Sequence, residues 1–239
     1  AEATAKLRKT NKRLAAAIFE SRDAEVNRRV ERAREACKTL LDVEESVIEA
    51  LLDRLTAAFE DAAERLAAQT VDVTGMGDVA SKVEKNHFAS RGVRESLRGQ
   101  VGIGVARPQG RGVSEIYSAA GVVFGLIPVT NPVATAFFKS LICLKSRNAL
   151  ILSLPRKAAK LGAELESLIV SVLRDGGWNK DLIQIVYENN SRKRTEAFFQ
   201  HPQIDLILAT GGPSMVRAAY SSGKPALGVG AGNAPVLIC

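Results

Sequence analysis

The 239-residue sequence has few cysteines, histidines and aromatic residues, and each shortage excludes a class of protein. Cys37, Cys143 and Cys239 are odd in number and widely spaced, so they form neither a disulfide framework nor a CxxC metal site, and we expect a cytoplasmic protein. His87 and His201 are too isolated for a zinc cluster, so no metal is expected. Aromatic residues make up only 5%, which leaves few stacking platforms for nucleic acid. No apolar run is long enough to cross a membrane.

The basic surplus is confined to the second half of the chain. Residues 1–120 contain 20 Lys and Arg against 19 Asp and Glu, whereas residues 121–239 contain 13 against 7. This surplus suits a small molecule that carries phosphate, although a generally solvated basic surface explains the charge equally well.

Residues 1–99 are expected to form an N-terminal helical segment. Apolar residues recur at helical spacing, and no Pro or Gly interrupts residues 1–70, so the pattern predicts helix throughout that stretch. The first twenty residues are basic and amphipathic, which fits a helix packed on its own domain or a helix that docks a partner or an enzyme shell. Gly75 and Gly77 break the pattern, and Asp78 is placed to cap a further helix that reaches residue 98.

Two segments with different textures follow. Residues 100–120 are rich in glycine and contain short β-like runs at 101–105 and 114–118, which predicts a hairpin or extended arm. Residues 121–239 alternate short apolar runs with helical stretches, and strands that are apolar on both faces indicate a parallel sheet covered on both sides. The expected strands are 122–127, 149–152, 183–186, 206–209 and 226–229, and the expected helices are 132–144, 158–174, 195–199 and 213–221.

Two turns at the ends of these strands are candidate binding segments. Thr130 and Asn131 follow the first strand, where an amide could stabilise a developing oxyanion, but Asn131 before Pro132 also suits a plain helix cap. Gly211 and Gly212 lie between a strand and a helix, where backbone N–H groups could face a phosphate. Any tight turn of this type uses glycine, so the spacing alone is a weak signal.

The segment Gly228–Asn233 contains GxGxG but does not fit the dinucleotide fingerprint. That fingerprint requires a helix after the glycines, and residues 234–238 instead read as another strand. These glycines more readily let the backbone pass close to a ligand or to another strand. Cys239 follows an apolar run with no base nearby, so we interpret it as a bystander, and Cys37 and Cys143 as core residues.

Three long segments in order resemble one family. TGMGDVASKVEKNHFAS (74–90), GVVFGLIPVTNPVATAFFKSLICLKSRNALILS (121–153) and IDLILATGGPSMVRAAYSSGKPALGVGAGNAPVLI (204–238) are similar to the CoA-acylating aldehyde dehydrogenases. These include the aldehyde half of bifunctional aldehyde–alcohol dehydrogenases, the microcompartment propionaldehyde and acetaldehyde enzymes, and sulfoacetaldehyde dehydrogenase. The resemblance runs from about residue 20 to the end and does not select the aldehyde.

The resemblance implies a Rossmann-like doubly wound α/β sheet of the aldehyde dehydrogenase type, with NAD as cofactor, CoA as co-substrate and a β-arm used in oligomerisation. It implies that Asn131 is the oxyanion donor, although the register of hydrolytic relatives could place Thr130 there. The cofactor-binding residues that it implies are Pro128, Thr130, Asn131, Ser153, Pro155, Thr210, Gly211, Gly212, Met215, Gly230 and Ala231. NADP also remains open, because Ser153, Arg156 and Lys157 could accept a 2′-phosphate.

The resemblance also indicates which part of such an enzyme this sequence represents. Val229 stands near the position where hydrolytic relatives have a water-activating Glu, which favours transfer to a thiol over hydrolysis. The family's nucleophilic Cys lies beyond the segment that Cys239 ends, so residues 121–239 are expected to supply the cofactor-binding sheet and to lack the catalytic domain. We therefore expect NAD-dependent oxidation of a small aldehyde to an acyl-CoA in the whole enzyme, and no turnover by this chain alone.

Other functions and partners follow from the same residues. A semialdehyde dehydrogenase relative of the same fold is one alternative, and a non-catalytic nucleotide-binding or assembly module is another. We expect a homo-oligomer, no nucleic-acid or membrane partner, and a cytoplasmic location that could lie inside a bacterial microcompartment.

Overall fold

A five-stranded parallel sheet forms the centre of the structure, a computed structural model that describes residues 24–109, 113–188, 190–230, 232, 236 and 237. The five strands expected between residues 122 and 229 are all present, each within a residue of its predicted bounds. In chain order the strands are β3 (Val122–Leu126), β4 (Ala149–Ser153), β5 (Ile183–Val186), β6 (Leu206–Thr210) and β7 (Ala226–Val229). The sheet confirms the doubly wound parallel fold, because all four strand pairs are parallel.

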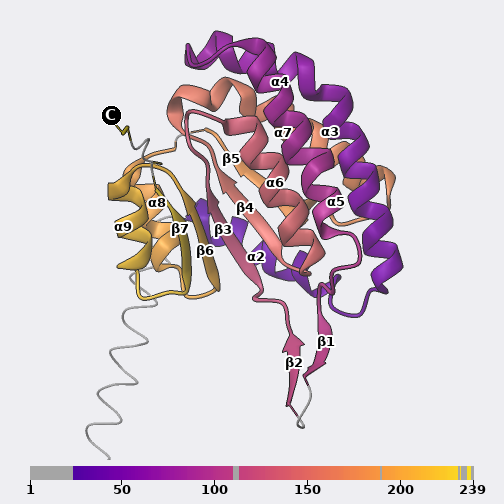
Figure 1. Ribbon diagram of the computed structural model, residues 1–239. Coiled ribbons are helices and arrows are strands. Elements are labelled where there is room, and N and C mark those ends of the chain that lie inside the picture. Colours follow the sequence, from indigo (N-terminus) through magenta and orange to yellow (C-terminus); the bar gives the residue numbers. More distant parts are fainter. Residues whose placement is uncertain (1–23, 110–112, 189, 231, 233–235, 238–239) are drawn as a thin grey trace, which may run out of the picture.

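The strand order, β5-β4-β3-β6-β7, is that of a Rossmann-type fold. The chain runs outward from β3 to β5, returns to the other side of β3, and continues outward through β6 to β7 (Figure 1). The connecting helices are α6 (Pro132–Lys145), α7 (Gly162–Asp175), α8 (Arg192–Gln200) and α9 (Pro213–Tyr220). The direction of winding reverses between β3 and β6, and in such sheets a crevice opens there at the carboxyl ends of the strands.

Alternate residues of β3, β4 and β5 pack into two separate hydrophobic cores, one on each face of the sheet. Val123, Leu150 and Ile185 pack against α6, α7 and a long N-terminal helix, α3 (Glu45–Thr74). Phe124 and Ile151 pack on the opposite face, against α8 and α2 (Ala24–Lys38). Because successive side chains of a strand point to opposite faces and both faces are covered, these runs are apolar at nearly every position; Ser153 and Gln184 are the exceptions.

The prediction of unbroken helix through residue 70 is wrong. Helix α2 ends at Lys38 and α3 begins at Glu45, with turns between them. The two helices lie on opposite faces of the sheet (Figure 1), so the chain has to pass around its edge, and tertiary packing overrides local propensity. The guanidinium of buried Arg147 fixes this turn by donating to the carbonyl of Val43 at 3.0 Å.

The helix predicted from Asp78 to residue 98 is present but contains a π-helical turn. Helix α4 (Val79–His87) passes into the π turn η1 (Phe88–Gly92) and then α5 (Val93–Leu97), and the Asp78 carboxylate caps α4 by accepting from Ser81 N at 2.8 Å. The predicted arm contains β1 (Gly104–Gln109) and β2 (Val113–Tyr117), an antiparallel pair that projects from the body (Figure 1). The first of these strands begins and ends later than the predicted run at 101–105.

Other boundaries differ where the sequence signal is short. A 3₁₀ segment, η2 (Arg156–Leu161), precedes α7, and a second, η3 (Lys180–Leu182), precedes β5. Helix α8 begins three residues earlier than predicted. The strand expected at 234–238 is not present at Val236 and Leu237, which are exposed and belong to no strand; the rest of it lies outside the described residues. The helix predicted for the first twenty residues, either packed on its own domain or docking a partner, also lies outside the described residues.

Candidate functional site

A pocket of about 1060 Å³ lies at the carboxyl ends of the sheet, where the winding reverses. The segment that follows each of the five strands contributes to its wall. The main lining segments are 126–131 after β3, 153–156 after β4, 190–192 after β5, 210–212 and 214–215 after β6, and Gly230 and Gly232 after β7. This placement is the one that a doubly wound sheet provides for a ligand.

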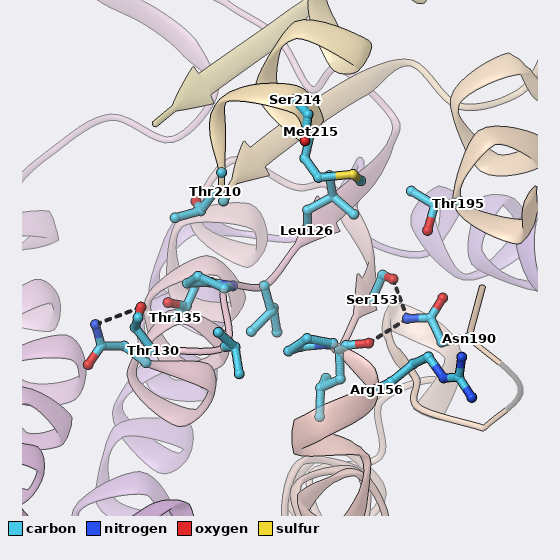
Figure 2. A pocket seen from close by; sticks show the side chains of 18 of the residues that line it. Leu126, Thr130, Thr135, Ser153, Arg156, Asn190, Thr195, Thr210, Ser214 and Met215 are labelled. Carbon is cyan, nitrogen blue, oxygen red and sulfur yellow. Dashed lines mark hydrogen bonds between the residues drawn. The ribbon is translucent and has the colours of Figure 1, made fainter. Parts of the chain in front are cut away.

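The structure brings the predicted cofactor-binding residues together in this pocket. All of those that it describes are lining residues: Pro128, Thr130, Asn131, Ser153, Pro155, Thr210, Gly211, Gly212, Met215 and Gly230. Ala231 lies outside the described residues. Ser153 and Asn190 lie at one side of the pocket and Thr130 and Thr135 at the other, with Thr210 and Met215 above the space between them (Figure 2).

The amino end of α9 faces the pocket without a side-chain cap. The N-cap residue is Gly212, which has no side chain to accept from the N–H groups of the first turn, and that turn contains no acidic residue. A Cβ added at Gly212 would meet no heavy atom within 4 Å, and one at Gly211 would meet only Met215 Cβ at 3.8 Å. Packing within the protein therefore does not require these glycines, and they leave open space in front of a helix terminus that favours anions.

The GxGxG segment separates into two roles. A Cβ at Gly228 would come within 2.6 Å of Val216 Cγ1 and 2.7 Å of Tyr220 Cε2, so this glycine lets β7 pack on α9. Gly230 and Gly232 instead line the pocket and have nothing within 4 Å of an added Cβ. The sequence left open whether these glycines approach a ligand or another element; Gly228 approaches another element.

The loop after β3 is held from below by a residue that sequence reasoning missed. Lys82 on α4 is buried, and its ammonium donates to the carbonyl of Thr130 at 2.7 Å. Burial and the charge of Lys85 lower the pKa of Lys82. Asn131 occupies the N-cap position of α6, but its amide donates to Thr130 Oγ1 at 3.4 Å rather than capping the helix. The amide is therefore not committed to the helix.

A second buried lysine joins the two strands at the point of reversal. Lys139 on α6 donates to the carbonyls of Leu126 at 2.5 Å and Leu208 at 2.7 Å, which belong to β3 and β6. Its burial lowers its pKa to about 7. A single lysine inside the apolar run Ala136–Leu144 is the sequence signal that could have revealed it.

The side of the pocket near β4 is polar and contains no carboxylate. The amide of Asn190 donates to Ser153 Oγ at 2.8 Å and to the carbonyl of Leu154 at 2.5 Å (Figure 2). Arg156 and Arg192 supply the only charged side chains among the described residues that line the pocket. Lys157, predicted as a possible phosphate contact, is not a lining residue. Asn190 and Arg192 were not singled out, because nothing local in the sequence places them beside β4.

The described cysteines and histidines lie away from this pocket. Cys37 and Cys143 are buried free thiols, and burial raises the pKa of both, that of Cys143 to about 12, so neither is a ready nucleophile. Cys239 lies outside the described residues. His87 has no carboxylate neighbour in the sequence, but the fold places Glu60 2.9 Å from its Nδ1. His201 is buried, and desolvation together with the charge of Lys224 lowers its pKa to about 4.

Comparison with known proteins decides the family. The model of the aldehyde dehydrogenase family matches residues 2–238, nearly the whole chain. The chain belongs to the aldehyde dehydrogenase family. It is 41% identical over 216 residues to the bifunctional aldehyde–alcohol dehydrogenase AdhE of Escherichia coli, covering 90% of this chain and 24% of that protein. It is 32% identical to the acetylating succinate-semialdehyde dehydrogenase of Clostridium kluyveri, covering 91% and 48%.

Solved structures show the same relation. An acetylating aldehyde dehydrogenase from Geobacillus thermoglucosidasius matches with a TM-score of 0.83 and 40% identity, covering 88% of this chain and 46% of that one. An engineered glycolyl-CoA reductase with bound NADP⁺ matches with a TM-score of 0.77 and 30% identity, covering 87% and 47%. This aldehyde dehydrogenase chain thus spans between about a quarter and a half of the length of these four proteins. The predicted resemblance to the acylating members is confirmed.

Two further features were sought among the described residues. These residues contain no helix long and apolar enough to span a bilayer. Within the same ranges, no group of three or more His, Cys, Asp or Glu side chains is arranged to hold a metal ion.

Proposed function

We propose that this chain binds NAD in the pocket at the carboxyl ends of its sheet and forms the cofactor-binding part of a CoA-acylating aldehyde dehydrogenase. The observation that carries the proposal is the open space in front of α9, where Gly211 and Gly212 leave room beside an uncapped helix terminus. A dinucleotide pyrophosphate is the anion that such a terminus in a doubly wound sheet accommodates.

The pocket's two sides suit the two ends of the dinucleotide. The adenosine ribose would lie near Ser153 and Pro155, and the nicotinamide near Pro128, Thr130 and Gly230. NAD, when bound, accepts a hydride from the substrate. Asn131 would donate its amide to a developing oxyanion, which accords with its lack of a capping bond. Lys82 and Lys139 would keep the loop after β3 and the crevice between β3 and β6 in place.

The whole enzyme would convert an aldehyde, CoA and NAD⁺ to an acyl-CoA, NADH and a proton. A cysteine thiolate attacks the aldehyde in this chemistry, and neither Cys37 nor Cys143 qualifies, because both are buried away from the pocket with raised pKa values. Val229 carries no base that could activate water against a thioester, which favours a thiol as acceptor. We therefore expect the nucleophile to lie outside the described residues.

The projecting arm supports an assembly of several copies. Val105, Val113, Ile116 and Tyr117 on β1 and β2 are all exposed, and a two-stranded ribbon with such side chains is not stable by itself in water. Pairing of the arm with another copy would cover them. Sedimentation of the chain against an Ile116→Glu variant tests this, with a shift toward monomer expected in the variant.

The test of NAD binding uses two serines at opposite ends of α9. Ser214 lines the pocket in the first turn, whereas Ser221 is the C-cap residue, and both are exposed. An aspartate in the first turn of a helix stabilises the helix, so Ser214→Asp should leave the fold intact while repelling the pyrophosphate. Calorimetric titration should show NAD⁺ binding to the original chain and to Ser221→Asp, and binding at least tenfold weaker in Ser214→Asp. Equal affinity in all three would remove the proposed site.

The same protein sample tests whether this chain binds the cofactor but lacks the catalytic nucleophile. NADH absorbance is followed with NAD⁺ and propionaldehyde, with and without CoA, alongside a circular dichroism spectrum. We expect a folded protein without turnover. CoA-dependent turnover would require a nucleophile within this chain, which then has to be Cys239.

A further inference from the structure

We infer that Lys82 makes the pocket bind NADH more tightly than NAD⁺, because it places a buried positive charge behind the nicotinamide end. This inference rests on the proposed function, since it concerns the same pocket. It gives Lys82 an electrostatic role in addition to its support of the loop after β3. A support alone would affect both redox forms of the cofactor equally, whereas a charge distinguishes them.

The first step is the position of the Lys82 ammonium. Lys82 is 5% exposed, and its Nζ reaches from α4 to donate to the carbonyl of Thr130 at 2.7 Å. Thr130 lines the pocket on the side where we place the nicotinamide (Figure 2). Thr130 therefore lies between a buried cation and the space that the cofactor would occupy.

The second step is the lack of a compensating charge. Among the described residues the ammonium has no ion pair, and the Thr130 carbonyl is its one hydrogen-bond acceptor. Burial and the charge of Lys85 lower the pKa of Lys82, and the opposing influence of Asp78 is the smallest of the three. No Asp or Glu is found among the described residues that line the pocket. The field of the ammonium therefore extends into the pocket with little compensation.

Two neighbouring features contribute charge of the same sign. Lys139 is buried and donates to the carbonyl of Leu126, which also lines the pocket, and within the described ranges it forms no ion pair. Helix α6 begins at Pro132, directly after the loop, so the positive end of its dipole points toward the same region. Nothing in the described wall opposes the charge of Lys82.

The third step is the chemical difference between the two forms of the cofactor. The nicotinamide ring of NAD⁺ carries a positive charge. Transfer of a hydride brings two electrons and one hydrogen nucleus to this ring, which becomes neutral, while the pyrophosphate and both riboses stay the same. A cation near the ring repels the oxidised form alone. Lys82 should therefore weaken NAD⁺ relative to NADH and favour hydride transfer from the substrate to bound NAD⁺.

The first test removes the charge of Lys82. Calorimetry measures the Kd of NAD⁺, NADH and ADP-ribose, which lacks the nicotinamide, on the full 239-residue chain and on Lys82→Gln. The original chain should bind NADH more tightly than NAD⁺. In Lys82→Gln the ratio of the NAD⁺ Kd to the NADH Kd should fall by roughly fivefold or more, and the Kd of ADP-ribose should change by less than about twofold.

Lys85→Gln is the matched control. Lys85 lies three residues further along α4 and is exposed, so solvent and salt screen its charge. Its removal should change the ratio of the two Kd values by less than about twofold.

A second pair of variants keeps Lys82 and its bond to Thr130. A Cβ added at Gly77 would lie 3.6 Å from Lys82 Nζ, and Gly77 does not line the pocket. Gly77→Asp places a carboxylate beside the ammonium, whereas Gly77→Asn has the same shape without the charge. Gly77 has φ of +72°, so both variants carry the same backbone strain, which cancels in the comparison. The ratio of the two Kd values should be lower in Gly77→Asp than in Gly77→Asn.

The possible results separate this inference from the proposed function. Equal weakening of NAD⁺ and NADH in Lys82→Gln, or the same ratio in Gly77→Asp and Gly77→Asn, would overturn the electrostatic role. Lys82 would then only hold the loop, and the proposed function would stand. Absence of binding by NAD⁺, NADH and ADP-ribose to the original chain would overturn the proposed function itself.

Discussion

The two sides of the sheet differ sharply in how deeply they are buried. Every residue of β3, β4 and β5 is buried, whereas β6 alternates between buried and half-buried residues and β7 between half-buried and exposed ones. Leu227 and Val229 on β7 are each 63% exposed. The difference lies in the covering helices. Two or more helices cover each face of the first group, but α9 covers one face of the second and buries only Ala219.

The pocket joins these unequal sides. Its wall takes Ser153 and the loop after β3 from the well-covered side, and Thr210 and the start of α9 from the sparsely covered side. A ligand that contacts both sides would stabilise the sparsely covered side by linking it to the well-covered one. We therefore expect ligand binding to stabilise the sparsely covered side more than the well-covered side.

Truncation of large side chains should show the largest contrast between the two sides. Phe59 on α3 is fully buried and stacks on Phe137, with ring centroids 4.0 Å apart. Phe59→Ala leaves a large cavity and should lower the free energy of unfolding by about 3–5 kcal/mol. Leu227→Ala on β7 should change it by less than about 0.5 kcal/mol. Urea denaturation measures both, and similar losses would mean that the sheet is uniformly supported.

Acid should weaken the protein through a group beside β6. His201 is neutral in the fold because its pKa is lowered from 6.5 to about 4, so the unfolded chain binds one more proton between these values. The stability that it contributes is complete above about pH 6.5 and is lost as the pH falls toward 4, about 3 kcal/mol in all. His201→Gln should flatten this part of the pH profile of unfolding. Urea denaturation of both proteins between pH 4 and 7 measures this, and an unchanged profile in His201→Gln would contradict the prediction.

Ligand binding should reduce the contrast. Without ligand, amide protons of β7 are expected to exchange through local opening, at a lower free energy than those of β4. At NAD⁺ concentrations of about 100 times Kd, binding adds about 2.7 kcal/mol, and the β7 amides should gain the full amount if local opening destroys the site. Hydrogen exchange with mass spectrometry measures this. A raised Tm without added protection of β7 would show that the ligand contacts the well-covered side alone.

The sequence predicted the sheet well because its signals there are local. Runs such as 122–127 and 149–152 contain no polar side chain, and glycine or a capping residue follows several of the strands, so the strands and the pocket's glycine turn could be predicted. The break between α2 and α3 could not. The break occurs because the chain passes from one face of the sheet to the other. Residues 39–44 contain no Gly or Pro, so the sequence carries no local signal for it.

The pocket residues that sequence reasoning missed share another cause. Lys82 and Asn190 act through contacts with residues 36 to 48 positions away, and Lys139 joins residues 13 and 69 positions away, so the pattern around each residue does not reveal its partners. Lys139 is the most informative of the three, because a cation in the middle of an apolar helix contradicts local patterning. Such contradictions are expected at functional sites. Asn190 and Arg192 follow β5 in the sequence, and their place in the pocket is explained only by the pairing of β5 with β4 in the sheet.

The smallest effect should come from the hydroxyl of Tyr220 on the sparsely covered side. This hydroxyl accepts from the backbone N–H of Gly228 at 2.9 Å and donates to the Gly228 carbonyl at 3.4 Å, and the tyrosine ring fills the space that a side chain at Gly228 would take. Tyr220→Phe keeps the ring and removes both bonds, so the free energy of unfolding should fall by about 1 kcal/mol or less, because water can reach these groups. The Gly228 amide should nevertheless exchange faster, since its opening no longer breaks the bond that it donates. If the amides of β4 changed their exchange rate by the same factor, β7 would open only together with the whole sheet. The two sides would then differ in exposure but not in stability.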